Sequence, residues 1–328
     1  MITLNWNITW VRAAPDGFSR PFIGINGQWP IPGVTVNYGE QLKINVYNGL
    51  VNETTAIHWH GIGQNTTNFE DGPAMVTQCP IPPGSTFVYQ FRLNQLGTYW
   101  FHAHVGGQYI DGLRAPLIVK DPSPPYGKVD GDITLALSDV YHDQAPNLIH
   151  YFLSPENTDA TGGAEPVPNA ALINEAQNVK ISVAAGKTYL FRVINMGAIA
   201  GQYLQFDQHT MTIVEVDGVY VQPYDVNQLF VSMAQRYSVI IKAKTDSSKN
   251  FAIVASMNAD MFGSSNTPAG MQPTVSIPPA YKCRTFHADS DRRLPTLCMI
   301  PRKRFRHHSL SRCSPSTTPF SCHWTRWP

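Results

Sequence analysis

The chain has 328 residues, of which 43% are hydrophobic and 14% are charged. This length holds two domains of ordinary size, and the hydrophobic share can fill two cores. With 24 Gly and 26 Pro, the composition favours many short strands joined by turns over long helices. The formal net charge of +1 gives no overall sign of a nucleic-acid partner, and no segment approaches the roughly 20 consecutive apolar residues of a transmembrane helix.

The N-terminal third has the pattern of a β-domain. Residues 1–7 have neither the basic start nor the apolar run of a secretory signal peptide, so no leader is visible. Alternating hydrophobic and polar residues over 41–47 and 85–93 predict half-buried strands. Three Asn-x-Thr sequons are acceptors for N-glycosylation if the chain is secreted. They begin at Asn7, Asn52 and Asn65.

Two His-x-His pairs are the most informative motif, His58 with His60 and His102 with His104. Both pairs lie in β-like sequence, where residues i and i+2 point to the same face, roughly 7 Å apart. That separation is too wide for one ion but suits two neighbouring metals. Imidazole as the only ligand type favours copper, zinc, iron or nickel over calcium or magnesium. The pairs predict part of a multinuclear metal site; a zinc site, or two unrelated exposed pairs, are the alternatives.

A second domain follows a short linker. The first domain is predicted over 1–121, a stiff Pro-rich linker over 122–131 and the second domain over 132–275. The second domain repeats the strand pattern without repeating the histidine pairs. Its clearest predicted strands are 187–194, 210–216 and 237–243.

The C-terminal segment 276–328 differs in composition. Residues 282–328 carry ten Lys or Arg against two Asp, whereas residues 1–281 carry fourteen against twenty-one Asp or Glu. A basic run at 301–306 is of the kind that binds nucleic acid or addresses a protein to the nucleus. The favoured interpretation is translation in a wrong frame or through an unspliced intron, and we predict an aberrant, disordered basic tail with no nucleic-acid partner.

Four motifs are the most specific in the chain: Ile25–Pro30, His58–Gln64, Asp71-Gly-Pro with Thr77–Pro80, and Gly97–His104. Together they resemble the first two domains of fungal multicopper oxidases of the laccase and iron-transport ferroxidase type. The resemblance covers roughly residues 1–275. Two segments, 107–116 and 163–168, look more like the ferroxidase branch than the phenol-oxidising laccases.

The resemblance implies an all-β fold of two cupredoxin-like Greek-key β-sandwich domains. In such oxidases a third domain supplies a mononuclear copper and half of the ligands of a trinuclear copper cluster, through a His-Pro-x-His-x-His run and a His-Cys-His run. Neither run is present here, so the third domain is expected to be missing and the chain inactive alone. By the same resemblance, His58 would bind the lone copper of the cluster, while His60, His102 and His104 would bind the coupled pair.

The resemblance also implies roles for two acidic residues. Asp71 matches a carboxylate beside the cluster that can assist proton delivery to oxygen; a turn-forming Asp before Gly72 is the alternative. Glu165 matches one of the acids that favour ferrous iron as substrate, whereas Gly263 takes the place of a second. Cys79 matches a cysteine that bridges to the C-terminal region in related laccases, and we expect it to be unpaired here.

The implied function is an oxidase that couples one-electron oxidation of a donor to reduction of O2 to water. The donor is ferrous iron in the ferroxidase branch, with an iron permease as partner, or phenols in a laccase. The family member would be extracellular or at the cell surface. A non-catalytic copper-binding fragment is the alternative from another class, and it would take up copper without consuming oxygen.

Overall fold

The computed structural model describes residues 1–157, 165–246, 248, 250–258, 262 and 274–277. The chain divides into two compact units, residues 1–282 and 283–328, and all described residues lie in the first. The prediction of a disordered tail over 276–328 lies outside the described residues, except for its first two positions, which end a strand. Among the described residues, no helix has the length and hydrophobicity to cross a membrane.

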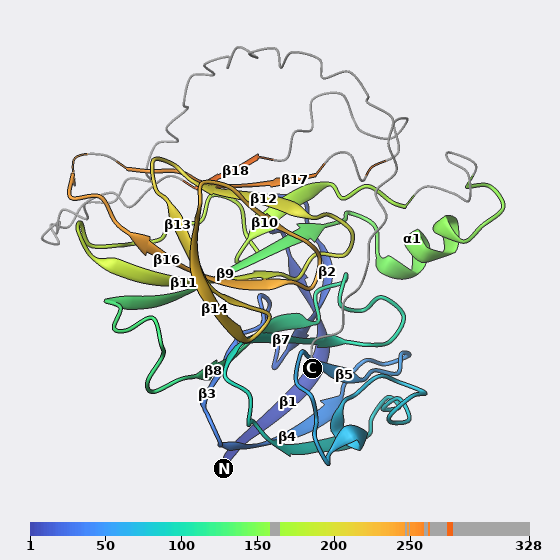
Figure 1. The fold of residues 1–328 in the computed structure, drawn as a ribbon. Helices are drawn as coiled ribbons and strands as arrows, with labels where there is room; N and C mark the ends of the chain where they lie inside the picture. Colours follow the sequence, from blue (N-terminus) through green and yellow to red (C-terminus); the bar gives the residue numbers. More distant parts are fainter. Residues whose placement is uncertain (158–164, 247, 249, 259–261, 263–273, 278–328) are drawn as a thin grey trace, which may run out of the picture. The chain divides into compact units, whose positions relative to one another are not determined.

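The first sandwich, coloured blue to teal in Figure 1, consists of two four-stranded sheets. One sheet has the order β2-β1-β4-β6, with strands Arg20–Ile25, Ile2–Ala13, Gln41–Asn48 and Thr86–Arg92. The other has the order β3-β8-β7-β5, with strands Val34–Asn37, Arg114–Lys120, Gly97–Ala103 and Ile57–His60. A turn of 3-10 helix, η1, spans Asn68–Glu70. The predicted strands 41–47 and 85–93 correspond to β4 and β6.

The core of this sandwich follows from the alternation of side chains. In β4, Leu42, Ile44 and Val46 are fully buried and the residues between them are not, because successive side chains of a strand point to opposite faces. In β5 and β7 the same alternation directs Trp59 and Phe101 into the core, with ring centroids 5.7 Å apart. The residues on either side of Trp59 therefore face away from the core.

The second sandwich, green to orange in Figure 1, pairs a six-stranded with a four-stranded sheet. The larger has the order β10-β9-β11-β16-β13-β14, with strands Ala170–Ile173, Gly131–Val140, Thr188–Asn195, Arg236–Lys242, Met211–Val216 and Val219–Val226. The smaller has the order β15-β12-β17-β18, with strands Leu229–Val231, Gln202–Phe206, Ile253–Met257 and Thr274–Ile277. The helix α1, Ala145–Phe152, follows β9. The predicted strands 187–194, 210–216 and 237–243 correspond to β11, β13 and β16, and the all-β prediction is confirmed.

Apolar packing and buried polar bonds join the two sandwiches. Trp100 and Ile118 of the first form a buried cluster with Ile194 of the second. Beside it, the fully buried Arg114 of β8 forms an ion pair with Glu175, with Nε 2.7 Å from Oε1. A buried charge is tolerated when it is paired and hydrogen-bonded, so this contact fixes how β8 lies against the second sandwich.

Candidate metal centre

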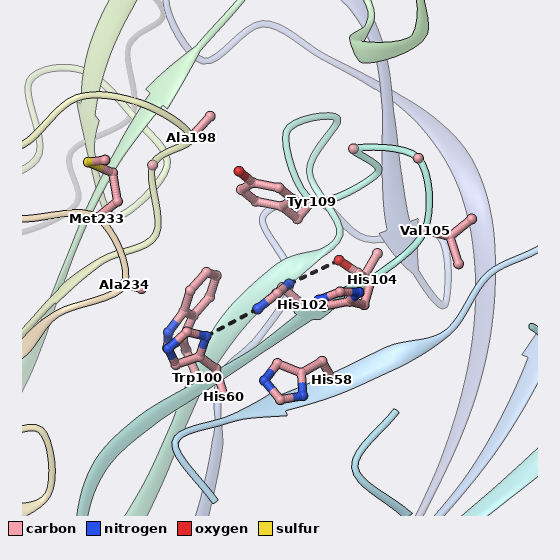
Figure 2. A pocket seen from close by; sticks show the side chains of 14 residues that line it. His58, His60, Trp100, His102, His104, Val105, Tyr109, Ala198, Met233 and Ala234 are labelled. Carbon is pink, nitrogen blue, oxygen red and sulfur yellow. Dashed lines mark hydrogen bonds between the residues drawn. The ribbon is translucent and has the colours of Figure 1, made fainter. Parts of the chain in front are cut away.

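Four imidazoles gather on the face of the β5/β7 pair that points away from the core (Figure 2). The strands are antiparallel, and their register sets His58 opposite His102. His60 lies two residues beyond His58 and therefore on the same face. His104 follows the end of β7, and its N–H donates to the carbonyl of Ala56 over 2.9 Å, which keeps it beside β5. The structure thus brings all four predicted ligands to one place.

The ring of His58 lies at the middle of the group. Its centroid is 5.5, 5.3 and 5.6 Å from those of His60, His102 and His104. His60 Nδ1 and His102 Nε2 are hydrogen-bonded, 3.3 Å apart. Two nitrogens bound at roughly 2.0–2.1 Å to one tetrahedral ion lie about 3.3 Å apart. This cross-strand pair therefore has the spacing of two ligands to a shared ion.

Backbone carbonyls orient two of the rings. His58 Nδ1 lies 2.9 Å from the carbonyl of Asp71, and His102 Nδ1 lies 2.9 Å from the carbonyl of Ala103. A carbonyl oxygen only accepts, so in each ring Nδ1 carries the proton and donates it. The lone pair then resides on Nε2. Such a bond to the second ring nitrogen is the usual support of a metal-binding histidine.

Burial keeps two of the imidazoles neutral. It lowers the pKa of His102 to about 3, assisted by the neighbouring His58. Burial also lowers the pKa of His60 to about 4, and the guanidinium of Arg236 adds to this effect. Because metal binding requires the unprotonated ring, both side chains are in the ligand form over the physiological pH range.

Trp100 forms one side of the site. Its ring stacks on His60, with centroids 4.9 Å apart and an interplanar angle of 28°, and on His102 at 4.3 Å and 29°. Trp100 is 3% exposed. A rigid aromatic surface under two neighbouring imidazoles restricts their rotation, so the site is pre-shaped by packing as well as by hydrogen bonds.

A cavity of about 480 Å³ opens in front of the histidines. Its walls come from both sandwiches: Val105 and Tyr109 follow β7, while Ala198 and Met233 belong to the second sandwich. Figure 2 shows Met233 on the side of the cavity away from the imidazoles, whereas the Tyr109 ring lies beside His102, with centroids 5.4 Å apart. The second sandwich therefore shapes the space in front of ligands that belong to the first.

Asp71 lies behind His58 and does not line this cavity. Its carboxylate Oδ1 is 3.4 Å from His58 Nδ1, and its side chain is 27% exposed. The next residue, Gly72, has φ +98°, and a Cβ there would overlap the carbonyl of Ile57. The loop is thus pressed against β5, which is why the Asp71 carbonyl reaches the His58 ring.

Two further predicted residues that the structure describes, Glu165 and Cys79, do not line the cavity. Glu165 is exposed. Gly263 lies outside the described residues. Cys79 is exposed and is a free thiol within the part of the chain that the structure describes.

Sequence reasoning missed the aromatic and second-sandwich parts of the site. Trp100 was detectable, because it precedes His102 by two residues in a strand and so shares its face. Met233 and Arg236 were not, because they lie more than a hundred residues further along the chain and no local pattern links them to a histidine.

The donor set fits a metal such as copper. It consists of imidazoles alone, with two lone pairs oriented by backbone carbonyls and two rings neutral because of burial. Such a set suits copper, zinc, iron or nickel. The geometry supports a metal centre for an ion of this group.

Comparison with known proteins narrows the choice of metal. Two multicopper oxidase family models match the chain, over residues 7–124 and 131–277. An iron transport multicopper oxidase, fetC of Epichloe festucae, is 53% identical over 263 residues, which is 80% of this chain and 42% of that protein. Another, FET3 of Gibberella zeae, is 52% identical over 260 residues, 79% of this chain and 41% of that protein. The chain thus spans about two fifths of the length of these curated relatives.

Solved structures give the same fold. Fet3p, described as a multicopper oxidase that functions in iron import, superposes with a TM-score of 0.82 at 38% identity over 90% of this chain and 55% of that chain. The laccase from Botrytis aclada superposes with a TM-score of 0.76 at 27% identity, again over 90% of this chain and 55% of that chain.

Proposed function

This chain belongs to the multicopper oxidase family, and from that premise we propose that it forms two domains of a ferroxidase, which oxidises ferrous iron and reduces O2 to water. Copper is the metal that the family implies. The observation that carries the proposal is the cluster of four imidazoles on and just after β5 and β7, all of which line one cavity. The likeness to relatives named for iron transport supports iron as the electron donor.

The four histidines would supply half of the ligands of a trinuclear cluster. His58, whose Nδ1 is bonded to a carbonyl, would present Nε2 to the lone copper. His60 and His102, whose facing nitrogens are 3.3 Å apart, would share one ion of the coupled pair, and His104 would bind the other. Copper held by these residues would supply one-electron redox chemistry and a binding place for O2.

The residues around the ligands would orient them and supply protons. Trp100 holds the His60 and His102 rings in place, and the Asp71 carbonyl fixes the His58 tautomer. The Asp71 carboxylate is partly exposed to solvent and lies 3.4 Å from the His58 ring. It would relay protons, through water, from solvent toward the oxygen being reduced.

Ferrous iron would deliver its electrons elsewhere in the complete oxidase, near Glu165, an exposed residue outside the histidine cavity. Four ferrous ions each lose one electron, and one O2 takes up these four electrons with four protons to form two waters. Export would place the enzyme at the cell surface, where an iron permease is the partner proposed for the ferric product. The exposed loop residues Asn52 and Asn65 are the proposed glycosylation sites.

Oxygen uptake tests the proposed reaction. In the complete oxidase that contains these domains, loaded with copper, we expect four ferrous ions consumed per O2 and slower turnover of a phenol. Glu165→Ala is expected to slow iron oxidation and leave phenol oxidation unchanged. Faster turnover of the phenol would favour the laccase alternative. Copper uptake without oxygen consumption with either donor would identify a non-catalytic copper-binding protein.

A further inference from the structure

The backbone of Thr98 in β7 is bonded by side chains of the second sandwich. The β5/β7 ladder ends at the pair His60 and Trp100, so beyond it the edge of β7 has no strand partner in the described chain. There the Thr98 N–H donates to Glu215 Oε1 over 2.8 Å, and the Thr98 carbonyl accepts from Arg236 Nε over 3.0 Å. A carboxylate and a guanidinium thus take the place that a continued β5 would occupy.

Arg236 also contacts the turn that follows His60. Gly61 has φ +89°, and a Cβ built there would lie 2.5 Å from Arg236 Nη2. The guanidinium therefore fills the position where any other residue would carry a side chain. It lies 5.5 Å from the centroid of the Tyr99 ring, next to Thr98. A single side chain thus closes the ends of both histidine-bearing strands.

The second sandwich holds this guanidinium rigidly. Arg236 Nη1 pairs with Asp217 Oδ1 at 3.0 Å and donates to the carbonyl of Ala234 at 3.2 Å. Arg236 is 5% exposed, and arginine's planar fork sets the directions of all its bonds at once. The second sandwich therefore fixes the position of the guanidinium through β16 and its neighbours. Nε of this group contacts β7, and Nη2 lies beside the turn that follows β5.

We propose that Arg236 is a positioning residue of the metal centre, which fixes from the second sandwich where the β5/β7 ladder ends and hence how His60 and Trp100 lie. The inference rests on the proposed metal-binding role of the histidines. Arg236 would not touch the metal. It belongs to the second sandwich, whereas the histidines belong to the first, and it would act through Gly61 and Thr98.

The test uses the full chain with Co²⁺ as the probe, because its visible absorption reports both affinity and ligand geometry. Arg236→Lys keeps the positive charge but loses the fork. We expect it to weaken Co²⁺ binding by about tenfold or more, as is usual for residues that orient metal ligands, and to change the absorption bands. Peptides that cover β5 and β7 are expected to exchange their amide hydrogens faster than in the unmodified chain.

Arg192→Lys is the matched control. Arg192 is also buried, lies on the adjacent strand β11 and pairs with Asp132. It also lies 3.7 Å from Glu215 Oε2, but its own hydrogen bond to Thr98, over 3.1 Å, goes to the hydroxyl and not to the backbone. We expect this variant to lose similar thermal stability and to keep Co²⁺ affinity within about twofold.

Three outcomes separate the possibilities. Equal Co²⁺ affinity and equal exchange of β5 and β7 in the two lysine variants would overturn the positioning role. Tighter Co²⁺ binding in Arg236→Met, with no change in Arg236→Lys, would also overturn it, because the residue would then act only as a repelling charge. If the unmodified chain binds no Co²⁺ or Cu²⁺, the proposed metal centre fails, and the exchange rates alone decide the positioning role.

Discussion

The indole ring of Trp100 lies nearly parallel to the imidazole of His102, at an interplanar angle of 29° and a centroid distance of 4.3 Å. The same indole stacks on His60. One buried side chain thus stacks on two rings that belong to different strands.

Replacement of Trp100 by Ala is expected to lower the free energy of unfolding by about 3–5 kcal/mol, because it leaves a cavity at a buried site. It should also loosen the His60 and His102 rings and weaken Cu²⁺ binding. Trp100→Phe keeps an aromatic surface and should retain most of the stability and most of the Cu²⁺ affinity. Urea unfolding and Cu²⁺ titration measure the two effects. Unchanged Cu²⁺ affinity in the Ala variant would show that the indole does not orient the ligands.

Acid is expected to destabilise the metal-free protein through His60 and His102. Burial lowers the pKa of these rings to about 4 and about 3, from about 6.5 in the unfolded chain. Between these values the unfolded chain binds more protons, so the free energy of unfolding falls as the pH falls below about 6.5. Each ring accounts for up to about 2 kcal/mol between pH 7 and pH 5.

Urea unfolding at about pH 7 and about pH 5 measures this loss. His60→Gln should reduce the difference between the two conditions, because glutamine does not titrate. His150→Gln, on the exposed face of α1, is the control and should leave the difference unchanged. An equal pH dependence in the unmodified chain and in the His60 variant would contradict the buried, neutral state of His60.

Gly72→Ala is expected to detach the Asp71 loop from β5. The residue has φ +98°, and its Cβ would overlap the Ile57 carbonyl. Gly84→Ala is a matched control, since Gly84 has φ +72° and nothing within 4 Å of an added Cβ. The control should cost only the backbone strain, about 1 kcal/mol, while the Gly72 variant should lose clearly more stability and bind Cu²⁺ more weakly. Similar losses in both would mean that the loop is not pressed on His58.

Asp71→Asn separates the two roles of Asp71. The backbone carbonyl that binds His58 Nδ1 is unchanged, so copper stoichiometry is expected to stay the same. The carboxylate is lost, so oxygen reduction by the complete oxidase should slow, and more so at higher pH where protons are scarce. Copper analysis measures the stoichiometry, and oxygen uptake measures the rate of oxygen reduction. A loss of copper with unchanged turnover per copper would assign the carboxylate to ligand orientation instead.

The sequence predicted the fold and the ligands through local pattern. Alternation in β4 and β6 predicts strands because burial repeats every second residue, and the spacing of His58 and His60 predicts a shared face for the same reason. The cross-strand contact of His60 with His102 was beyond reach, because it depends on the register of β5 and β7, which the alternation of either strand leaves open.

Long-range polar contacts were also beyond local pattern. Thr98 is an ordinary strand residue in the sequence, yet residues 117 and 138 positions away, Glu215 and Arg236, bind its backbone. The pairing of Arg114 with Glu175 is of the same kind, over 61 positions. Such contacts follow from how two sandwiches meet, and no short window of residues contains that information.

The bonds to Thr98 also bear on the order of events during synthesis. All four histidines are translated by residue 104, but the side chains that close the β7 edge come from residues 215 and 236. Contacts so distant in sequence form late, because a long loop must first close. A nascent chain that ends after the first sandwich would therefore display the imidazoles beside a β7 edge that still lacks its two side-chain partners.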